Sequence, residues 1–471
     1  MKQPSKWLIF GAVALAQIMV VLDTSIVNVA FPSIQRSLHF TLESLQWVVT
    51  AYTITFGGFL LLGGKAADQL GRRRTLIIGM AGFTLSSFLI GVSGSATMLI
   101  VFRALQGLSA AFMSPAALSI VLATFTGHKE RHQALAYWAA VAPIGGTIAG
   151  LVGGVLTQYA GWRWDFLINV PIGIAALIAI PRLVPKHENE SRETSVDISG
   201  AVLVTVGVMT IVYGLSQATT WGWGSLNFLG VLGVGLVLLA GFVYNESRVK
   251  HPLIPLSIFK VRNVSGANLT MALVYGGMLG MTLMLSLFIQ TILHYSPTMT
   301  GVAFLPFPLL VAATSTQMPK ILAKFGFKVP LLVGPLLIAI SVLLMAHHLT
   351  VDAKYFWDIV PTLILFPIGV GLTYMPVYTA ASSGVSPQQA GVASGLINTS
   401  QQLGGSVGLA VLSSIAATTA ASSSQALGML ESAVRGYGHA LMAGICFMVL
   451  AWLTVVFILK PSHVQPAKSG S

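Results

Sequence analysis

The chain consists almost entirely of long apolar stretches separated by short polar segments. A helix needs about 20 mainly apolar residues to cross the hydrocarbon core of a bilayer. Hydrophobic residues make up 55% of the 471 residues and charged residues only 8%, and a soluble domain of that composition would have to build its surface from apolar side chains. The sequence therefore predicts an all-α polytopic membrane protein.

The apolar stretches predict fourteen membrane-spanning helices. They group as an N-terminal six-helix bundle at 1–186, two inserted helices with their connectors at 187–262, a C-terminal six-helix bundle at 263–460 and a tail at 461–471. Two related bundles with a site between them near the membrane midplane are typical of secondary transporters. The predicted spans are 7–32, 44–65, 75–94, 97–124, 132–158, 164–183, 197–217, 226–245, 264–293, 300–322, 329–347, 357–381, 390–418 and 437–459.

The net charge of +12 comes from short loops between apolar stretches and not from a basic surface of the kind that binds nucleic acid. Of the 25 Lys and Arg residues, Arg103 falls within a span, and only four fall in the loops on the side opposite the two termini. Lys and Arg of short loops accumulate on the cytoplasmic side, so both termini are expected to be cytoplasmic. The four exceptions are Arg36, Arg163, Lys354 and Arg435.

Two ionisable residues, Asp23 and Arg103, cannot be assigned to loops, and Asp23 is expected to be the only acid within a span. Charged groups inside a membrane are costly and usually functional. Desolvation favours the protonated carboxyl of Asp23, whereas a nearby arginine favours the ionised form, which suits a group that loads and releases a proton. The alternatives are an aspartate that caps a helix break or stays permanently paired with Arg103, and an arginine that serves only as a structural hydrogen-bonding hub.

The turn at 64–74 combines Gly64, Asp68 and Gly71 with Arg72 and Arg73. Topology-setting charge explains the arginines but not the aspartate between two glycines. This turn resembles the signature loop of the major facilitator superfamily, with glutamine at 69 in place of the usual basic residue. Segments 22–32, 103–107, 162–173 and 390–395 also resemble the fourteen-helix drug:proton antiporters of that superfamily, so the resemblance covers essentially the whole chain.

The resemblance implies roles for these residues. Asp23 would be the proton-binding acid with Arg103 as its partner, and Asp68 with Arg72 would form a cytoplasmic gate. The antiporter motif of the fifth helix departs from the family pattern, because Gly150 occupies the position of the usual proline. Tight packing without an antiport role is an equal alternative for these small residues, which are Pro143, Gly146, Gly150, Gly153 and Gly154.

The last six predicted helices contain no charged residue at a central position. Exporters of doubly charged cations in this family tend to use an additional acid, so a neutral or monocationic substrate is expected here. Polar and aromatic residues near the predicted midplane are candidates for the substrate cavity, although packing is the simpler role for each one. These candidates are Asn28, Gln106, Tyr374, Tyr378, Asn398, Gln401 and Gln402.

The resulting functional hypothesis is a proton-coupled exporter of hydrophobic or monocationic drugs, dyes or disinfectants in a bacterial inner membrane. An exporter of one endogenous metabolite or lipid is the first alternative, and a scaffold that transports nothing is the second. No metal-ligand spacing, nucleophile motif or phosphate-binding glycine loop occurs in a suitable context. We therefore expect no catalytic residue, metal or cofactor, and coupling to a proton gradient instead of ATP.

Overall fold

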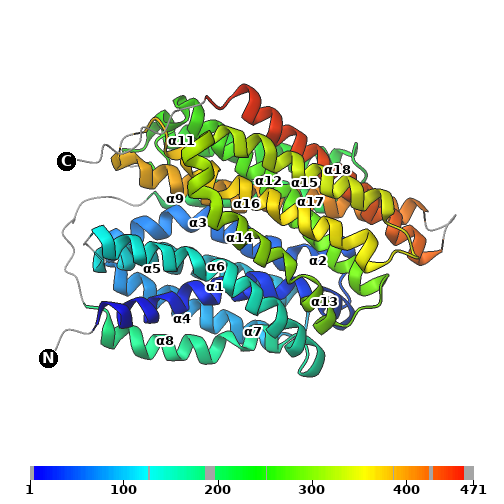
Figure 1. Cartoon of the computed structure of the whole chain (residues 1–471), viewed down its shortest axis with the longest axis horizontal. Coiled ribbons are helices and arrows are strands. Elements are labelled where there is room, and N and C mark those ends of the chain that lie inside the picture. Colours follow the sequence, from blue (N-terminus) through cyan, green and yellow to red (C-terminus); the bar gives the residue numbers. More distant parts are fainter. Residues whose placement is uncertain are drawn as a thin grey trace. The chain divides into compact units, whose positions relative to one another are not determined.

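The computed structural model describes residues 5–125, 128–185, 197–250, 252–385, 387–423 and 428–460. These residues are almost entirely helical, and no strand occurs among them. The tail predicted at 461–471 and most of the connector that begins at 187 lie outside them. The predicted all-α membrane architecture is confirmed (Figure 1).

The helices form two compact units. Unit 1 comprises Met1–Leu253 and Ile289–Leu305. Its helices run side by side in Figure 1, with the short α7 at the end of the unit opposite the N-terminus. They are α1 (Lys6–Leu38), α2 (Leu42–Leu45), α3 (Trp47–Leu70), α4 (Arg72–Gly91), α5 (Ala96–Thr124), α6 (His128–Tyr159), α7 (Trp164–Leu167), α8 (Asn169–Leu183), α9 (Ile198–Ser216), α10 (Ala218–Trp221), α11 (Leu226–Arg248) and α13 (Pro297–Ala303).

Unit 2 comprises Ile254–Phe288 and Pro306–Ser471. Its α12 and α17 approach closely because Gly276 faces the backbone of Gly404 and Gly408, and small residues allow such contact between membrane helices. Its elements are η1 (Leu256–Lys260), α12 (Arg262–Thr291, whose last turn belongs to unit 1), α14 (Pro306–Phe325), α15 (Lys328–His348), the π-helical turn η2 (Tyr355–Ile359), α16 (Val360–Ser382), α17 (Pro387–Ser423) and α18 (Met429–Phe457).

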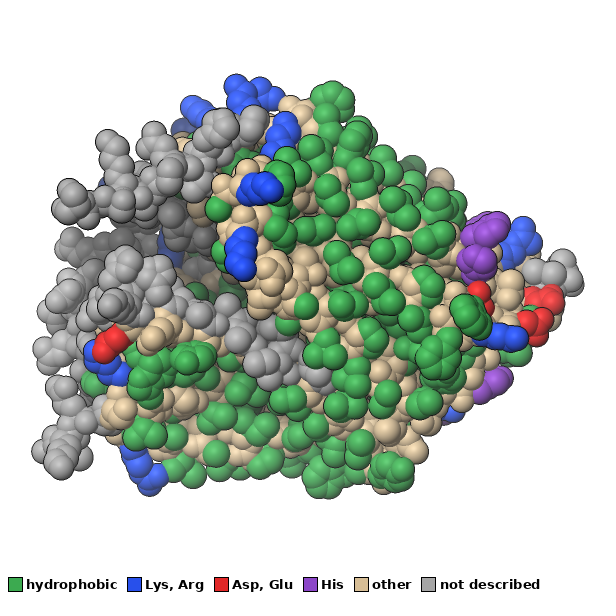
Figure 2. Space-filling model, viewed as in Figure 1, with side chains coloured by type: hydrophobic (Ala, Val, Ile, Leu, Met, Phe, Trp, Pro, Cys, Tyr) green, Lys and Arg blue, Asp and Glu red, His purple; other side chains and the backbone are tan. Residues whose placement is uncertain are grey.

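Within the described ranges, twelve helical segments are long and apolar enough to cross a membrane. The other two predicted spans, 44–65 and 132–158, fall on α3 and α6, whose apolar stretches Trp47–Leu60 and Ile148–Tyr159 are shorter. The count of fourteen is therefore not strictly confirmed. Hydrophobic side chains cover much of the surface between the helix ends, as expected where lipid is the solvent (Figure 2).

Helix α3 lies between the core of unit 1 and the inserted pair α9 and α11. On one side, the backbones of α3 and α5 approach closely at Gly107, where any side chain would overlap the Tyr52 carbonyl. On the other side, a side chain at Gly58 would overlap Thr205 of α9. The helix that ends in the turn at 64–74 therefore contacts both α5 and the inserted pair.

A polar cluster at one end of the inserted pair contacts α3. Asp197 caps α9 by accepting a hydrogen bond from the Gly200 amide at 2.9 Å, and Asn245 of α11 donates to the same carboxylate at 2.7 Å. Burial opposes ionisation of Asp197, but its hydrogen bonds, including one from Ser199, more than offset this and lower its pKa. Lys65 of α3 interacts electrostatically with both Asp197 and Glu246, so opposite charges hold the inserted pair against α3.

Candidate functional site

Asp23 lies in the middle of α1, and its side chain is completely buried in unit 1. Helix α1 continues without interruption from Lys6 to Leu38, so the alternative of a carboxylate that caps a helix break is wrong. The neighbouring polar residues are satisfied by their own helix, since Thr24 donates to the Val20 carbonyl at 3.0 Å and Asn28 to the Thr24 carbonyl at 3.4 Å. Among these residues of α1, Asp23 is thus the one whose charge must be balanced by other helices.

Arg103 of α5 forms an ion pair with Asp23, with 2.5 Å between Nη1 and Oδ2. The arginine is 1% exposed, and its Nε donates to the Val48 carbonyl of α3 at 2.6 Å. Its guanidinium carbon also lies 4.4 Å from the centre of the Tyr52 ring, a cation–π distance. The predicted pairing is therefore present, and three helices enclose it.

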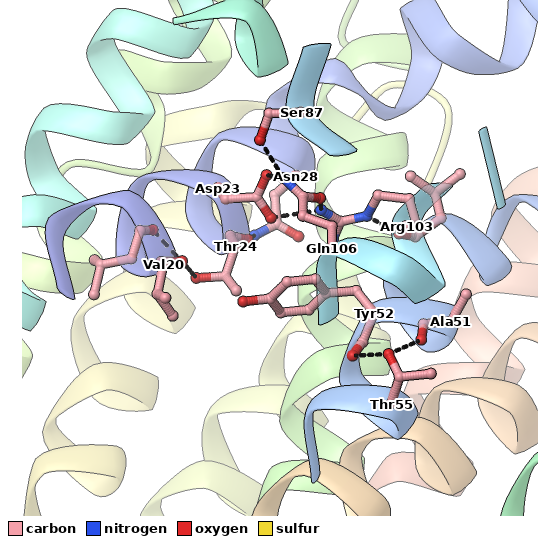
Figure 3. A network of polar contacts seen from close by, with 12 residues as sticks. Val20, Asp23, Thr24, Asn28, Ala51, Tyr52, Thr55, Ser87, Arg103 and Gln106 are labelled. Carbon is pink, nitrogen blue, oxygen red and sulfur yellow. Dashed lines mark hydrogen bonds and ion pairs between the residues drawn. The ribbon is translucent and has the colours of Figure 1, made fainter. Parts of the chain in front are cut away.

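Gln106 bridges this ion pair to α4. Its Nε2 donates to Asp23 Oδ1 and to Ser87 Oγ, both at 2.8 Å, while its Oε1 accepts from Arg103 Nη1 at 2.7 Å. Figure 3 shows Asp23 facing Arg103 and Gln106, with Ser87 on the far side of the amide. The sequence suggested Gln106 only as a cavity candidate and did not indicate Ser87.

The network holds charge in a place where charge is costly. Both oxygens of Asp23 accept hydrogen bonds and one faces a guanidinium, which stabilises the carboxylate, while complete burial disfavours it. Addition of a proton to Asp23 would weaken its attraction to Arg103 and free the arginine for another acceptor. The arrangement can therefore exist in two charge states that differ in how tightly they hold α1 against α5.

The local sequence explains why α5 delivers these two side chains to α1. Gly107 and Gly63 allow α3 and α5 to touch along their backbones, and Thr55 of α3 donates to the Ala104 carbonyl of α5 at 2.9 Å. Arg103 and Gln106 are three residues apart and share one helix face. Their position is thus determined by close helix packing on either side of them.

The structure contains a second fully buried acid that the sequence interpretation missed. Asp165 of α7 is 0% exposed and accepts a hydrogen bond from Thr157 of α6. The prediction that Asp23 is the only acid within a span is therefore wrong, because Asp165 lies within the membrane-spanning segment Trp164–Leu183. Its position between two tryptophans and a phenylalanine, Trp162, Trp164 and Phe166, was a usable signal.

The turn at 64–74 joins α3 to α4 through Gly71, whose φ of 91° is a conformation that side chains rarely adopt. Arg73 donates from Nη2 to the Pro181 carbonyl at 2.6 Å, and Arg72 is exposed. Asp68 lies in the last turn of α3, but its side chain is outside the described atoms. The gating roles of Gly64, Asp68, Gly71, Arg72 and Arg73 therefore stay predictions.

The glycines of the fifth-helix motif lie on α6 and pack against its neighbours. Gly153 faces Ile26 of α1, and Gly154 lies against the backbone of Pro297 and Thr298. Thr298 donates to the Gly154 carbonyl at 2.9 Å. These contacts support the packing interpretation of the motif, and its antiport role stays a prediction. Gly150 faces Gly301 at an ordinary distance and Gly146 is half-buried, while the side chain of Pro143 lies outside the described ones.

Four of the other candidates meet in unit 2. The Tyr378 hydroxyl donates to Asn398 Oδ1 at 2.5 Å, and Gln401 donates to the Tyr374 hydroxyl at 3.4 Å. Gln402 is half-buried beside them in sequence. All the buried charged residues among the described ones, including Asp23, Arg103 and Asp165, belong to unit 1. Unit 2 therefore presents aromatic rings, hydroxyls and amides without buried charge, and no group of metal-ligating side chains occurs in the described ranges.

The sequence matches a known protein family. Residues 13–409 match the family model described as Major Facilitator Superfamily. The chain belongs to the major facilitator superfamily. It is 37% identical over 463 residues to the puromycin resistance protein pur8 of Streptomyces alboniger, a match that covers 96% of this chain and 92% of that protein. It is therefore a multi-pass membrane transporter.

Two further relatives are named for export or resistance. The tetracenomycin C resistance and export protein of Streptomyces glaucescens is 36% identical, with 86% of this chain and 75% of that protein covered. The multidrug resistance protein Stp of Mycobacterium tuberculosis is 34% identical, with the same coverage. Among solved structures, the POT family transporter PepTSo superposes with a TM-score of 0.69 over 97% of this chain and 99% of that chain at 17% identity, which shows the shared fold.

Proposed function

We propose that the protein is a proton-driven antiporter that exports small hydrophobic or monocationic compounds by alternating access. The observation that supports this most directly is the buried network of Asp23, Arg103, Gln106 and Ser87. It contains a carboxyl whose charge can change and a fixed cation that responds to the change. Relatives named for resistance and export support the outward direction.

The network supplies a physical basis for coupling. With Asp23 ionised, the ion pair ties α1 to α5 and its negative charge favours a cationic or polarised substrate. With Asp23 protonated, both effects weaken, so substrate affinity and helix packing change together. A ligand can shift a conformational equilibrium only by binding the two states with different affinity, and the proton meets this condition by removing one charge from a buried pair.

The substrate class follows from the contrast between the units. Unit 2 offers hydroxyl and amide groups at Tyr374, Tyr378, Asn398 and Gln401 but no buried charge among its described residues. Such a surface favours neutral or singly charged aromatic compounds over doubly charged ones. The opposing charge for a monocation would come from Asp23 alone. No cofactor is required, because the proton gradient supplies the free energy.

We further propose that both termini face the cytoplasm of a bacterial cell, as the distribution of Lys and Arg predicts. In that orientation the turn at 64–74 is cytoplasmic. Gly71 permits the tight connection between α3 and α4, and Asp68 with Arg72 would hold the cytoplasmic ends of the helices together in the outward-open state only.

Efflux from proteoliposomes with the variant Asp23→Asn tests the function. Asparagine resembles the protonated carboxyl in size and charge, so the variant should fold and bind neutral substrates but lose uphill efflux driven by a pH gradient. Asp352→Asn, which removes an exposed carboxylate, is the matched control and should transport like the wild type. Undiminished uphill efflux by Asp23→Asn would show that the proton is carried elsewhere.

An exporter of one endogenous compound is the second candidate, and its narrow specificity is supported by two relatives that are each named for a single compound, puromycin or tetracenomycin C. The two candidates differ in breadth of substrate. Susceptibility of a host with and without the gene, measured across neutral and cationic compounds, separates them. A resistance shift for several unrelated compounds supports the multidrug exporter, and a shift confined to one compound supports the specific exporter.

A further inference from the structure

Asp165 is a buried carboxyl that the proposed coupling through Asp23 does not use. Its Oδ2 accepts a hydrogen bond from Thr157, and its Oδ1 has no hydrogen-bond partner among the described residues. None of the ion pairs found in the described ranges includes it. An isolated carboxylate in such surroundings costs several kcal/mol, about as much as burial of any unpaired ion, whereas a neutral carboxylic acid needs only hydrogen-bond partners.

No described cation compensates Asp165. Helix α7 packs against α1, α4, α6 and α8. The arginine on its own segment, Arg163, donates to the Ser93 carbonyl at 3.0 Å and stacks on Trp162. Midway along these four helices, the charged residue that the structure describes is Asp23, and its charge is already neutralised by Arg103. The other charged residues of these four helices lie at their ends and are Lys6, Arg36, Arg72, Arg73, Arg74, Lys129, Glu130, Arg131 and Arg182, with His128 and His132.

The residues beside Asp165 and Thr157 contact the Asp23 network and its helix. The next residue of α7, Phe166, has its ring centre 5.6 Å from the guanidinium carbon of Arg103. On α6, Gly153 packs against Ile26 one turn before Thr157, and Ile26 follows Asp23 by three residues. Asp23 is in the middle of α1, whereas α7, the helix that carries Asp165, lies at the end of unit 1 opposite the N-terminus (Figure 1). In the proposed topology this is the outer side.

Asn169 adds further unused hydrogen-bonding capacity beside this carboxyl. It follows Asp165 by four residues, is 0% exposed, and neither its Nδ2 nor its Oδ1 has a partner among the described residues. Most buried polar atoms in proteins are hydrogen-bonded. A carboxyl with free hydrogen-bonding capacity can accept a proton and pass it on, and an amide in the same buried layer can hydrogen-bond either of its forms.

We propose that Asp165 is a second proton-carrying carboxyl, placed between the outer surface and Asp23. It holds a proton, gives it to the carboxylate of Asp23 and is then reprotonated from the outer side, so that its unpaired carboxylate exists only transiently. The O–H bond of Asp165 breaks as that of Asp23 forms, so the transfer conserves charge and needs no other reactant. This inference rests on the proposed proton-driven function and adds the route by which the proton reaches its site.

Infrared difference spectra of the purified protein, recorded between acid and alkaline buffer, test the assignment directly. The wild type should show a carboxylic-acid C=O band that persists in Asp23→Asn, disappears in Asp165→Asn and shifts in Thr157→Val, which keeps the carboxyl but removes its hydrogen bond. Proton uptake over the same pH range should be about one proton per protein lower in Asp165→Asn than in the wild type. Equal uptake and an unchanged band would overturn the proposal.

Transport separates this inference from the proposed function. In proteoliposomes, Asp165→Asn should bind substrate normally but slow proton-driven efflux by about tenfold or more, as loss of a proton-transfer group does. If the wild type itself shows no pH-driven efflux, the proposed function fails, while the infrared band still decides whether Asp165 titrates. If the wild type is coupled and Asp165→Asn keeps its rate, the relay is wrong. Should Asp165→Asn fail to fold, Thr157→Val still decides the assignment: a shifted band supports it, and an unchanged band with an unchanged rate of efflux overturns it.

Discussion

Removal of Arg103 tests how strongly the buried ion pair stabilises unit 1. The variant Arg103→Met retains an unbranched side chain but leaves Asp23 with the single hydrogen bond from Gln106. Because the two charged side chains are 1% and 0% exposed, loss of one partner should destabilise the protein by about 3–5 kcal/mol, and replacement of both by apolar residues should be nearly neutral. The double variant Asp23→Leu/Arg103→Met is therefore expected to regain most of the lost stability without regaining transport.

The assay is unfolding in detergent micelles, with the free energy compared for wild type, both single variants and the double variant. The exposed pair Lys6 and Glu130, whose side chains are 49% and 51% exposed, is the matched control, and Lys6→Met should cost at most about 1 kcal/mol. An unpaired Asp23 can also take up a proton, so the penalty of Arg103→Met should shrink as the pH is lowered. Additive single-variant effects, with no recovery in the double variant, would refute the argument.

Three other perturbations test the topology, the gate and the inserted pair. Asp68→Asn should lower turnover in vesicles far more than expression or substrate binding, and wild-type turnover would make the turn a topology signal alone. Asp197→Asn should lose the attraction to Lys65. Because the pKa of Asp197 is lowered, the contribution of this carboxylate to stability is full at neutral pH and is lost as the pH falls through that lowered pKa. The stability gap between wild type and this variant should therefore stay constant near neutrality and narrow only in acid, whereas a gap that closes between pH 8 and 6 contradicts the assignment. Reporter fusions after Lys129, Lys260 and Lys468 should indicate the cytoplasm, and fusions near Ser95 and Ser423 should indicate the outside. A carboxyl terminus on the outside would contradict the fourteen-helix topology.

Hydropathy predicted the spans well but their ends less well. Helix α18 begins at Met429 and not near 437, although Glu431 lies in its first turn. A hydrophobic pattern detects the part of a helix that contacts lipid, whereas backbone hydrogen bonds continue into the polar region for as long as the chain permits. The predicted span 300–322 is likewise divided into α13 and α14 at Phe304–Leu305, just before Pro306, which lacks the amide hydrogen that an unbroken helix would use.

The pairing of Asp23 with Arg103 was predictable because each is costly alone within a span. Their remaining partners were not predictable from local pattern. The Val48 carbonyl and Ser87 reach the site through packing of α3 and α4, and a serine or a carbonyl in an apolar helix has no distinctive sequence signal. Asp165 was not predicted for a related reason: it stands at the start of a predicted span, and its burial against α6 depends on the tertiary fold.

The exposure of α11 to lipid determines how freely its sequence can vary. Along α11, residues such as Leu229, Val234 and Val237 are more than half exposed, so lipid and not protein is their neighbour. Any apolar side chain satisfies that environment about equally well. Sequence drift should therefore be rapid on the lipid-facing side of α11 and slow at Asn245, at Glu246 and at Gly235, where a side chain would overlap Ile211 of α9. A synthetic helix could replace α11, provided that it kept those polar positions and the buried face that packs on α9.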